Sequence, residues 1–520
     1  MIVFLRIEVK AIPRNQLKTS YTAIKPPKLL RESRAPSEAG LAAETNTVFL
    51  VGRGRPVRDL PYGSVLTERI RRHRYLETAA EPLVIDLPND AGTRLALAFV
   101  GEDDAPFVTL TRARKLLAPH KDAQQLYVAC FGLSRQAGAR ALKAIVAATL
   151  SERAAMPDFR RAAARPESRL ASLRLWGPDI TPDLKRLVAE ARGNHLARYL
   201  TALPADRLTP GIYRAEATRI ARAHGWKCEF FDERKLAKRG AGAFLAVARG
   251  SQARDAGILR LSYRPPGKPA ASLALVGKGI CFDTGGVNVK GARHMYGMHE
   301  DMQGSAVALG TLAALTELKV PFAVDAWLAL ARNDIGPDAY RPNEVVTAMN
   351  GTTIEIVHTD AEGRMVLADT LSLACGGRPK LVIDYATLTG ACVYALGTGY
   401  SGAFTNRPAW AARIIKAGRE SGERVWPFPL DDDYAEALKS DIADVKQCVL
   451  EGEADHMLAA LFLRRFLVGD PDWIHLDLSA GRHKGGLGPI PTDVTGFGVY
   501  LTLRLLLDDN LLGTARAHPG

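Results

Sequence analysis

Several features that would place a protein in a special class are missing or scarce in this sequence. No apolar run reaches about 18 residues, the length that a membrane-spanning helix needs, so we expect no membrane contact. Charged residues at positions 6, 8 and 10 interrupt the apolar start too early for a secretory signal. Only six cysteines occur in 520 residues, and none forms a Cys-x-x-Cys pair. This scarcity indicates reduced thiols and a cytoplasmic protein.

The charge is unevenly distributed along an otherwise ordinary composition. The chain is 47% hydrophobic and 24% charged, with a net charge of +13. Residues 1–200 hold 33 Lys and Arg against 20 Asp and Glu, so the whole excess lies there. A basic region of this kind is either a solvated surface or a nucleic-acid-binding face, which would lie within residues 46–200. No helix-turn-helix or zinc-finger signature accompanies it, so only electrostatics supports nucleic acid as a partner.

The hydrophobic pattern predicts an N-terminal tail followed by a small α/β domain. Residues 1–45 contain scattered prolines and charges with little periodicity, so we expect a poorly ordered tail. Short β-branched runs, typical of strands, then alternate with a helical pattern at 139–154. The predicted strands cover 47–51, 82–87, 94–100 and 126–133. A small basic α/β domain over 46–176 follows from this pattern.

A second, larger α/β domain is predicted over residues 204–513, after a linker at 177–203. The linker contains one long helix, 181–203, with Thr181 as its cap and Pro204 as its stop. The predicted strands are 226–231, 271–277, 321–330, 353–358, 381–388 and 473–479, and the helices between them include 302–318, 363–375 and 454–468. The alternation predicts a mixed, mostly parallel sheet covered by helices on both faces.

The stretch Gly-Ile-Cys-Phe-Asp-Thr-Gly-Gly at 279–286 raises the question of what Asp283 does. Phe-Asp-Thr-Gly is how an aspartic protease presents its catalytic carboxylate, but that chemistry needs two carboxylates sharing a proton. The chain offers no second Asp-Thr/Ser-Gly, because the candidates at Asp369 and Asp493 have the wrong following residue or spacing. The acid-dyad interpretation is therefore rejected.

Further acidic residues recur beside glycines near the ends of predicted strands, where open α/β sheets bind ligands. The three segments are 276–291 with Lys278, Asp283 and Lys290, 299–305 with Asp301, and 358–371 with Asp360, Glu362 and Arg364. Converging carboxylates repel unless divalent cations join them, and Mg²⁺, Mn²⁺ and Zn²⁺ suit carboxylate oxygens. Spacing alone leaves a two-metal hydrolase site and plain turn or helix-terminus residues both open. A metal-dependent phosphoesterase would use similar carboxylates, but usually with His ligands.

The same three segments resemble the signature segments of the leucyl aminopeptidase (cytosol aminopeptidase) family. They read VGKGICFDTGGVNVK, HEDMQGS and HTDAEGRMVLADTL, and LTGA at 388–391 and DVTGFGV at 493–499 are also similar. The resemblance covers about residues 203–505. It implies a metal-dependent aminopeptidase that removes N-terminal, leucine-like residues from peptides, in a homohexamer.

The resemblance also implies a role for each site residue. Two divalent ions, Mn²⁺ or Zn²⁺ with Mg²⁺ and Co²⁺ as alternatives, would be held by Lys278, Asp283, Asp301, Asp360 and Glu362. Lys278 would ligate as a neutral amine, because two cations beside it depress its pKa. Lys290 and Arg364 would be catalytic: Lys290 polarises the scissile carbonyl, and Arg364 holds a bicarbonate ion as general base.

The expected side-chain pocket consists of Met298, Thr387 and Gly390, which are small or apolar and suit a leucine-like residue. Two positions depart from the family pattern. His358 stands where the family usually has Asn, and it could alter the substrate preference or the pH profile. Residues 475–486 differ from the family's more apolar version of that segment.

Overall fold

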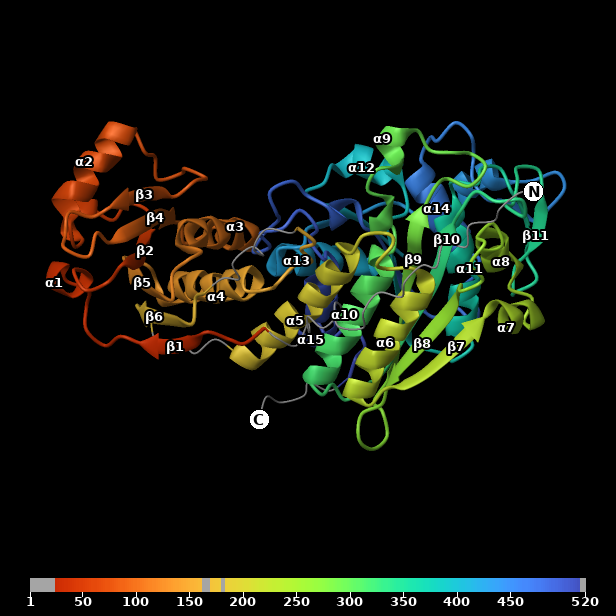
Figure 1. The fold of residues 1–520 in the computed structure, drawn as a ribbon, viewed down its shortest axis with the longest axis horizontal. Helices are drawn as coiled ribbons and strands as arrows, with labels where there is room; N and C mark the ends of the chain where they lie inside the picture. Colours follow the sequence, from red (N-terminus) through yellow and green to blue (C-terminus); the bar gives the residue numbers. More distant parts are fainter. Residues whose placement is uncertain (1–23, 161–168, 179–182, 515–520) are drawn as a thin grey trace, which may run out of the picture.

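The computed structural model describes residues 24–160, 169–178 and 183–514. Figure 1 shows a smaller lobe, drawn in red to orange, beside a larger lobe that contains the elements drawn in green to blue. The smaller lobe is built on a six-stranded sheet and the larger on an eight-stranded sheet. Within these described ranges, no helix is long and apolar enough to cross a bilayer.

The six-stranded sheet has the order β1-β6-β5-β2-β4-β3, and only β3 runs antiparallel to its neighbour. Its strands are β1 (Lys28–Arg31), β2 (Asn46–Gly52), β3 (Leu83–Asp86), β4 (Arg94–Val100), β5 (Gln125–Phe131) and β6 (Ser172–Trp176). Its helices are α1 (Glu38–Leu41), α2 (Gly63–His73), α3 (Pro106–Leu117) and α4 (Arg135–Glu152). Apolar side chains of β2 point alternately to the two faces of the sheet. Val48 and Leu50 pack with α3 and α4 on one face, and Phe49 and Val51 pack on the face that α2 covers.

Residues 24–45 correct the expectation of a poorly ordered tail over 1–45. Residues 28–31 form β1, which pairs in parallel with β6 at the edge of the sheet. Leu41 is buried in the core beneath α2. Pro26 and Pro27 suggested a tail, but both precede β1, and the start of an edge strand tolerates proline. Residues 1–23 lie outside the described part of the chain.

One long helix, α5 (Leu184–Thr201), joins the lobes, as its apolar spacing predicts. The side chain of Asp183 accepts a hydrogen bond from the Arg186 backbone N–H and caps the helix. The predicted cap, Thr181, lies outside the described residues. Helix α5 crosses α10 (Gln303–Glu317) at two glycines, where a Cβ on Gly193 would lie 2.5 Å from the Gly310 carbonyl oxygen.

The eight-stranded sheet is mixed, with the order β15-β14-β17-β13-β9-β10-β8-β7. Its strands are β7 (Lys227–Asp232), β8 (Gly257–Tyr263), β9 (Ser272–Asp283), β10 (Ala323–Asn333), β13 (Leu381–Ala386), β14 (Ser401–Thr405), β15 (Val425–Pro427) and β17 (Asp472–Asp477). The central strands β17, β13, β9 and β10 are mutually parallel. Their carboxyl ends therefore meet at one edge, as the sequence predicts.

Helices cover both faces of this sheet. The core on one face includes residues of α5, α10, α6 (Pro210–His224), α13 (Ala411–Ser421) and α15 (Val499–Leu507). The core on the other includes residues of α7 (Glu233–Lys238), α8 (Gly242–Ala248), α11 (Glu362–Cys375) and α14 (Asp455–Arg464). The short helices α9 (Ala292–Met295) and α12 (Gly390–Leu396) lie near each other at the upper edge of the larger lobe in Figure 1.

The stretch 353–358, expected to be a strand of the main sheet, belongs elsewhere. Its strand part, β12 (Thr353–Glu355), pairs with β11 (Val345–Thr347) and β16 (Val445–Lys446) in a separate three-stranded sheet. Two very short partners are enough to satisfy its backbone. The segment that follows β12 therefore reaches the site from a different sheet than Asp283 does.

Candidate active site

A cavity of about 1500 Å³ opens at the carboxyl edge of the central strands. All of the site residues predicted from the sequence line it. These are Lys278, Asp283, Lys290, Met298, Asp301, His358, Asp360, Glu362, Arg364, Thr387 and Gly390. The structure thus brings three distant segments together, while the role of each residue stays a prediction.

Three buried carboxylates form the floor of the cavity. Asp283 ends β9, Asp301 lies just before α10, and Glu362 is the first residue of α11. One oxygen from each lies within 4.8 Å of the others, a spacing at which a metal ion could be held. Their exposed fractions are 2%, 6% and 1%. Burying three acidic groups so closely is costly unless cations compensate them.

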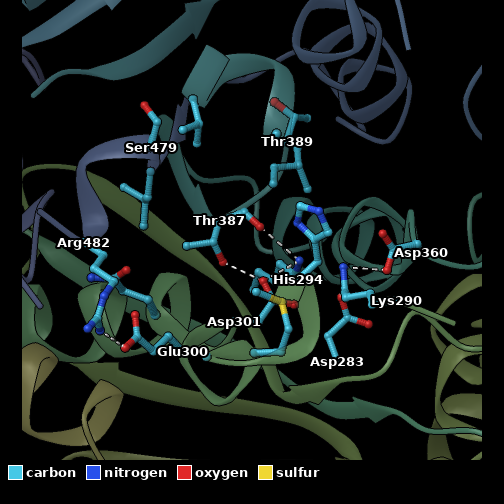
Figure 2. Close-up of a pocket in the computed structure, with 18 of the residues that line it drawn as sticks. Asp283, Lys290, His294, Glu300, Asp301, Asp360, Thr387, Thr389, Ser479 and Arg482 are labelled. Carbon is cyan, nitrogen blue, oxygen red and sulfur yellow. Dashed lines mark hydrogen bonds and ion pairs between the residues drawn. The ribbon is translucent and has the colours of Figure 1, made fainter. Parts of the chain in front are cut away.

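Two lysines supply part of that compensation. Lys278, on β9, places Nζ 2.8 Å from both Asp301 Oδ1 and Glu362 Oε1. Lys290 places Nζ 2.9 Å from Asp283 Oδ2 and 2.5 Å from Asp360 Oδ1. Figure 2 shows Lys290 between Asp283 and Asp360, with Asp301 on the opposite side of the group. Four carboxylates and two ammonium groups leave two negative charges uncompensated.

The close packing of these buried carboxylates and lysines shifts their pKa values. Burial raises the pKa of Glu362 to about 8, and the charge of Asp283 adds to the shift. Burial likewise raises the pKa of Asp301 to about 6, against the opposing effect of Lys278. Burial alone would lower the pKa of Lys278, but its carboxylate neighbours outweigh burial and raise it. The carboxylates therefore gain from any added cation.

The donor set fits divalent cations. Buried oxygens Asp301 Oδ2 and Glu362 Oε2 have no hydrogen-bond partner among the described residues. Unpartnered buried carboxylate oxygens are expensive, and they are the ligand atoms that hard and borderline divalent ions prefer. Asp283 is oriented from behind, because its Oδ1 accepts hydrogen bonds from Gly285 N and Asn333 Nδ2. Such supporting bonds fix a ligand's direction.

Arg364 lies on α11, two residues after Glu362, and is almost fully buried at the edge of the cavity. Its Nη2 donates to Asp455 Oδ1 at 2.7 Å, and its Nη1 donates to the Gln447 carbonyl at 3.1 Å. Burial lowers the pKa of Arg364, but Asp455 outweighs burial and raises it. The guanidinium already has an anionic partner from the chain itself.

Comparisons with known proteins identify the family of the chain. The family model for the "Cytosol aminopeptidase family, catalytic domain" matches residues 195–503. The chain belongs to the cytosol aminopeptidase family. A probable cytosol aminopeptidase of Acidovorax ebreus (strain TPSY) is 38% identical over 431 residues, 82% of this chain and 84% of the relative. Its counterpart in Albidiferax ferrireducens is 37% identical over 452 residues, 85% of this chain and 92% of the relative.

Solved structures of the family have the same fold. A mutant of tomato leucine aminopeptidase superposes with a TM-score of 0.81 at 28% identity, covering 93% of this chain and 96% of its own. A bottromycin maturation enzyme in complex with Mn gives 0.75 at 28% identity, covering 89% and 99%. The α/β fold and the assignment as a hydrolase of the metalloaminopeptidase type are thereby confirmed.

In this aminopeptidase, the residues expected to form the side-chain pocket have further contacts. Thr387 donates from Oγ1 to Asp301 Oδ1 at 2.7 Å, and its carbonyl accepts from Lys278 Nζ at 3.0 Å. Thr387 therefore orients two predicted ligands. Met298 precedes Asp301 by one short turn, and Gly390 begins α12. Both line the cavity.

The two departures from the family pattern differ in their surroundings. His358 lines the cavity, and its Nδ1 accepts a hydrogen bond from Asp360 N at 3.2 Å. Within the altered segment, His475 is fully buried, with Nδ1 2.6 Å from Asp384 Oδ1. The ring centroid of Trp473 lies 6.1 Å from that of His475, nearly parallel to it. His475 thus belongs to the core of the family fold, whereas Ser479 and Arg482 reach the cavity (Figure 2).

Sequence reasoning missed the residues that hold the loop carrying Asp360. Gln447 is fully buried, and its Oε1 accepts from the N–H groups of Val357 and His358 at 3.2 Å. Its Nε2 donates to the Ala361 carbonyl at 3.0 Å. Asn333 ends a buried strand, so its position could have suggested a site role. Gln447 follows a two-residue strand and carries no such signal.

Proposed function

We propose that this protein removes N-terminal amino acids from peptides, with a preference for leucine-like residues, using two divalent cations. The carrying observation is the buried Asp283–Asp301–Glu362 cluster at the cavity, in which Asp301 Oδ2 and Glu362 Oε2 have no hydrogen-bond partner among the described residues. The tomato and Trypanosoma cruzi structural relatives are named leucine or leucyl aminopeptidases, which supports the leucine-like preference.

Five residues would hold the cations, which we expect to be Mn²⁺ or Zn²⁺, with Mg²⁺ and Co²⁺ as alternatives: Lys278, Asp283, Asp301, Asp360 and Glu362. Bound there, divalent ions lower the pKa of water and polarise the scissile carbonyl. Glu362 lies beside Lys278 and Asp283 lies beside Lys290, so both carboxylates would be available to cations in this cluster. Mn in the complex of the bottromycin maturation enzyme supports a divalent ion of this kind.

The chain's own residues supply orientation and charge. Lys290 lines the cavity, and 15% of its side chain is exposed. Its ammonium group is therefore placed to stabilise negative charge on the substrate's carbonyl oxygen. Cations held at this cluster would favour the lone pair of a neutral amine, and only the N-terminal residue of a peptide carries a free α-amine. Met298, Thr387 and Gly390 would receive the side chain of that residue.

The bicarbonate ion predicted on Arg364 does not fit the arrangement of this site. Asp455 already forms an ion pair with Arg364, and the Gln447 carbonyl accepts from its Nη1, so a bicarbonate ion would compete with a carboxylate of the chain itself. Bicarbonate therefore has no part in the proposed reaction. Four further expectations stay predictions: the homohexamer, the cytoplasmic location that the relatives' names suggest, nucleic-acid binding through residues 46–200, and a modulating role of His358.

Hydrolysis of leucine p-nitroanilide tests the proposed function. Purified protein is assayed after chelation, again with Mn²⁺ or Zn²⁺, and as the Lys290→Ala variant. We expect activity that disappears on chelation, returns with metal, and falls by at least about 100-fold in the variant. An N-acetylated substrate should be inert, because it lacks the free amine. Activity that survives complete chelation would contradict the proposal.

A further inference from the structure

The ion pair between Arg364 and Asp455 lies at the wall of the active-site cavity. The side chain of Arg364 is only 3% exposed, and its Nη2 donates a charge-assisted hydrogen bond of 2.7 Å to Asp455 Oδ1. Asp455 is the first residue of α14, and it follows Ala454, whose φ of 54° is unusual for a non-glycine residue. The chain thus turns sharply to deliver this carboxylate to the guanidinium.

The side chain of Asp455 is partly exposed to the cavity. Its side chain is 23% exposed and lines the same cavity as Asp360 and Glu362. Its Oδ1 is bound to Arg364, while Oδ2 accepts no hydrogen bond from any residue in the described part of the chain. One oxygen is therefore fixed and the other is available to a group in the cavity.

Arg364 has little capacity for another anion. A guanidinium binds a planar oxyanion through parallel N–H donors, and two of the nitrogen atoms here are taken by Asp455 and the Gln447 carbonyl. The remaining Nε is buried and has no hydrogen-bond partner among the residues that the structure describes. An external anion would have to compete with the Asp455 carboxylate, which the chain itself places on Arg364.

We propose that Asp455 is the anion of Arg364 and the proton acceptor of the hydrolytic reaction, which makes this enzyme independent of an added carboxylate or bicarbonate. The catalytic part rests on the proposed aminopeptidase function. As the water oxygen bonds to the carbonyl carbon, its proton passes to Asp455 Oδ2. The proton then goes to the leaving nitrogen as the C–N bond breaks, so Asp455 ends as a carboxylate again. Arg364 holds Asp455 in position throughout.

The first test measures anion binding without any assay of activity. Thermal unfolding of the Mn²⁺-loaded protein is compared in bicarbonate and in chloride at equal ionic strength and pH. We expect no difference for the wild type and a higher Tm in bicarbonate for Asp455→Ala, whose Arg364 is exposed to the anion. Asp493→Ala is the control, because it removes a carboxylate from Arg482 in the same cavity. Wild-type stabilisation equal to that of Asp455→Ala would overturn the proposal.

The second test measures turnover of the same proteins. We expect kcat to fall by at least about 100-fold in Asp455→Ala and Asp455→Asn. Formate or bicarbonate should restore part of the activity in Asp455→Ala, but not in Asp455→Asn, whose amide occupies the position. Asp455→Asn that keeps wild-type kcat, or a wild type that bicarbonate activates, would overturn the proposal. If the wild type hydrolyses no aminoacyl substrate, the proposed function fails, and the thermal test still decides what Arg364 binds.

Discussion

Gly363 lies directly against the side chain of Lys278. A Cβ placed on Gly363 would be 2.6 Å from Nζ of Lys278 and 2.7 Å from its Cε. Gly363 is the second residue of α11, between the predicted ligand Glu362 and Arg364. The absence of a side chain at this position is therefore what allows Lys278 to reach Asp301 and Glu362.

Gly363→Ala should weaken metal binding and catalysis without lowering the stability of the fold. Alanine is favoured over glycine within a helix by about 1 kcal/mol, so the variant should not unfold more easily. Its methyl group should nevertheless displace Lys278, and we expect a fall of about 10-fold or more in metal affinity and kcat. Metal titration by calorimetry and a melting curve measure both quantities.

Gly377→Ala is the matched control, because an added Cβ there lies 3.5 Å from the Ala374 carbonyl oxygen, an ordinary contact. It lies just past the far end of α11 and should leave metal binding unchanged. Wild-type metal affinity in Gly363→Ala would show that Lys278 is not held where the structure places it.

Metal removal should inactivate the enzyme without unfolding it. Lys278 and Lys290 bridge the four carboxylates pairwise, so the stripped site keeps part of its charge compensation. We expect the chelated protein to retain its far-UV circular dichroism and to melt a few degrees lower. Saturating metal at about 100 times Kd would restore about 2.7 kcal/mol.

Lys278→Met tests the reason for that expectation. Without its ammonium group, Asp301 and Glu362 face each other uncompensated in the stripped protein. The stripped Lys278→Met protein should therefore melt at a lower temperature than the stripped wild type. An equal Tm for the two stripped proteins, or a wild type that unfolds on chelation at 25 °C, would contradict this role of the lysine.

Several strands and one long helix were predictable from the sequence, because the hydrophobic pattern within each segment determines them. The strands at 47–51, 94–100 and 381–388 and the long helix before Pro204 have strong hydrophobic periodicity. By contrast, β9 extends to Asp283, well beyond its predicted end, because Lys278 and two glycines interrupt the apolar run. Near the active site, Lys278 is buried within β9 although its charge predicts an exposed position.

The long-range part was not predictable from one sequence. The stretch 353–358 has a strand pattern, but nothing local says that β12 pairs with β16 instead of the main sheet. The predicted metal ligands were recognised from motifs, and the structure brings them to one cavity. Asp455 was missed, since it meets Arg364 only through the packing of α14 near α11, 91 positions along the chain.

Gln447→Ala should loosen the loop that carries Asp360. The substitution leaves two backbone N–H groups, of Val357 and His358, and the Ala361 carbonyl without their buried partner. We expect a loss of about 1–3 kcal/mol in the free energy of unfolding, because buried unsatisfied groups cost that much. Metal affinity should fall about 10- to 100-fold, as for other residues that orient ligands.

Urea unfolding and metal titration measure these two effects. Gln125→Ala serves as the control, since Gln125 Nε2 contacts Glu44 in the first sheet at 3.4 Å, far along the chain from the site. If Gln447→Ala lost stability but kept wild-type metal affinity, Gln447 would support the fold without orienting Asp360.

Glu423 should make the stability fall as the pH rises. Its side chain is buried against the N-terminus of α15, where Oε2 accepts hydrogen bonds from Gly498 N and Leu501 N at 2.9 and 2.8 Å. Burial raises the pKa of Glu423 to about 8 from an ordinary value of 4.5. The folded state therefore binds a proton that the unfolded state has already lost. The contribution is fully present below about pH 4.5 and is lost as the pH rises through 8, by up to about 1.4 kcal/mol per pH unit.

Glu423→Gln should remove this pH dependence, because the amide oxygen accepts the same two hydrogen bonds and never ionises. Urea unfolding at a series of pH values between 5 and 9 gives the difference in free energy between variant and wild type. That difference should grow in favour of the variant as the pH rises. Glu420→Gln, which breaks a partly exposed ion pair with Arg504 near the end of α13, should show no such trend. Parallel pH profiles for Glu423→Gln and the wild type would mean that the Glu423 carboxyl is ionised in the folded protein, held by the N-terminal N–H groups of α15 despite its burial.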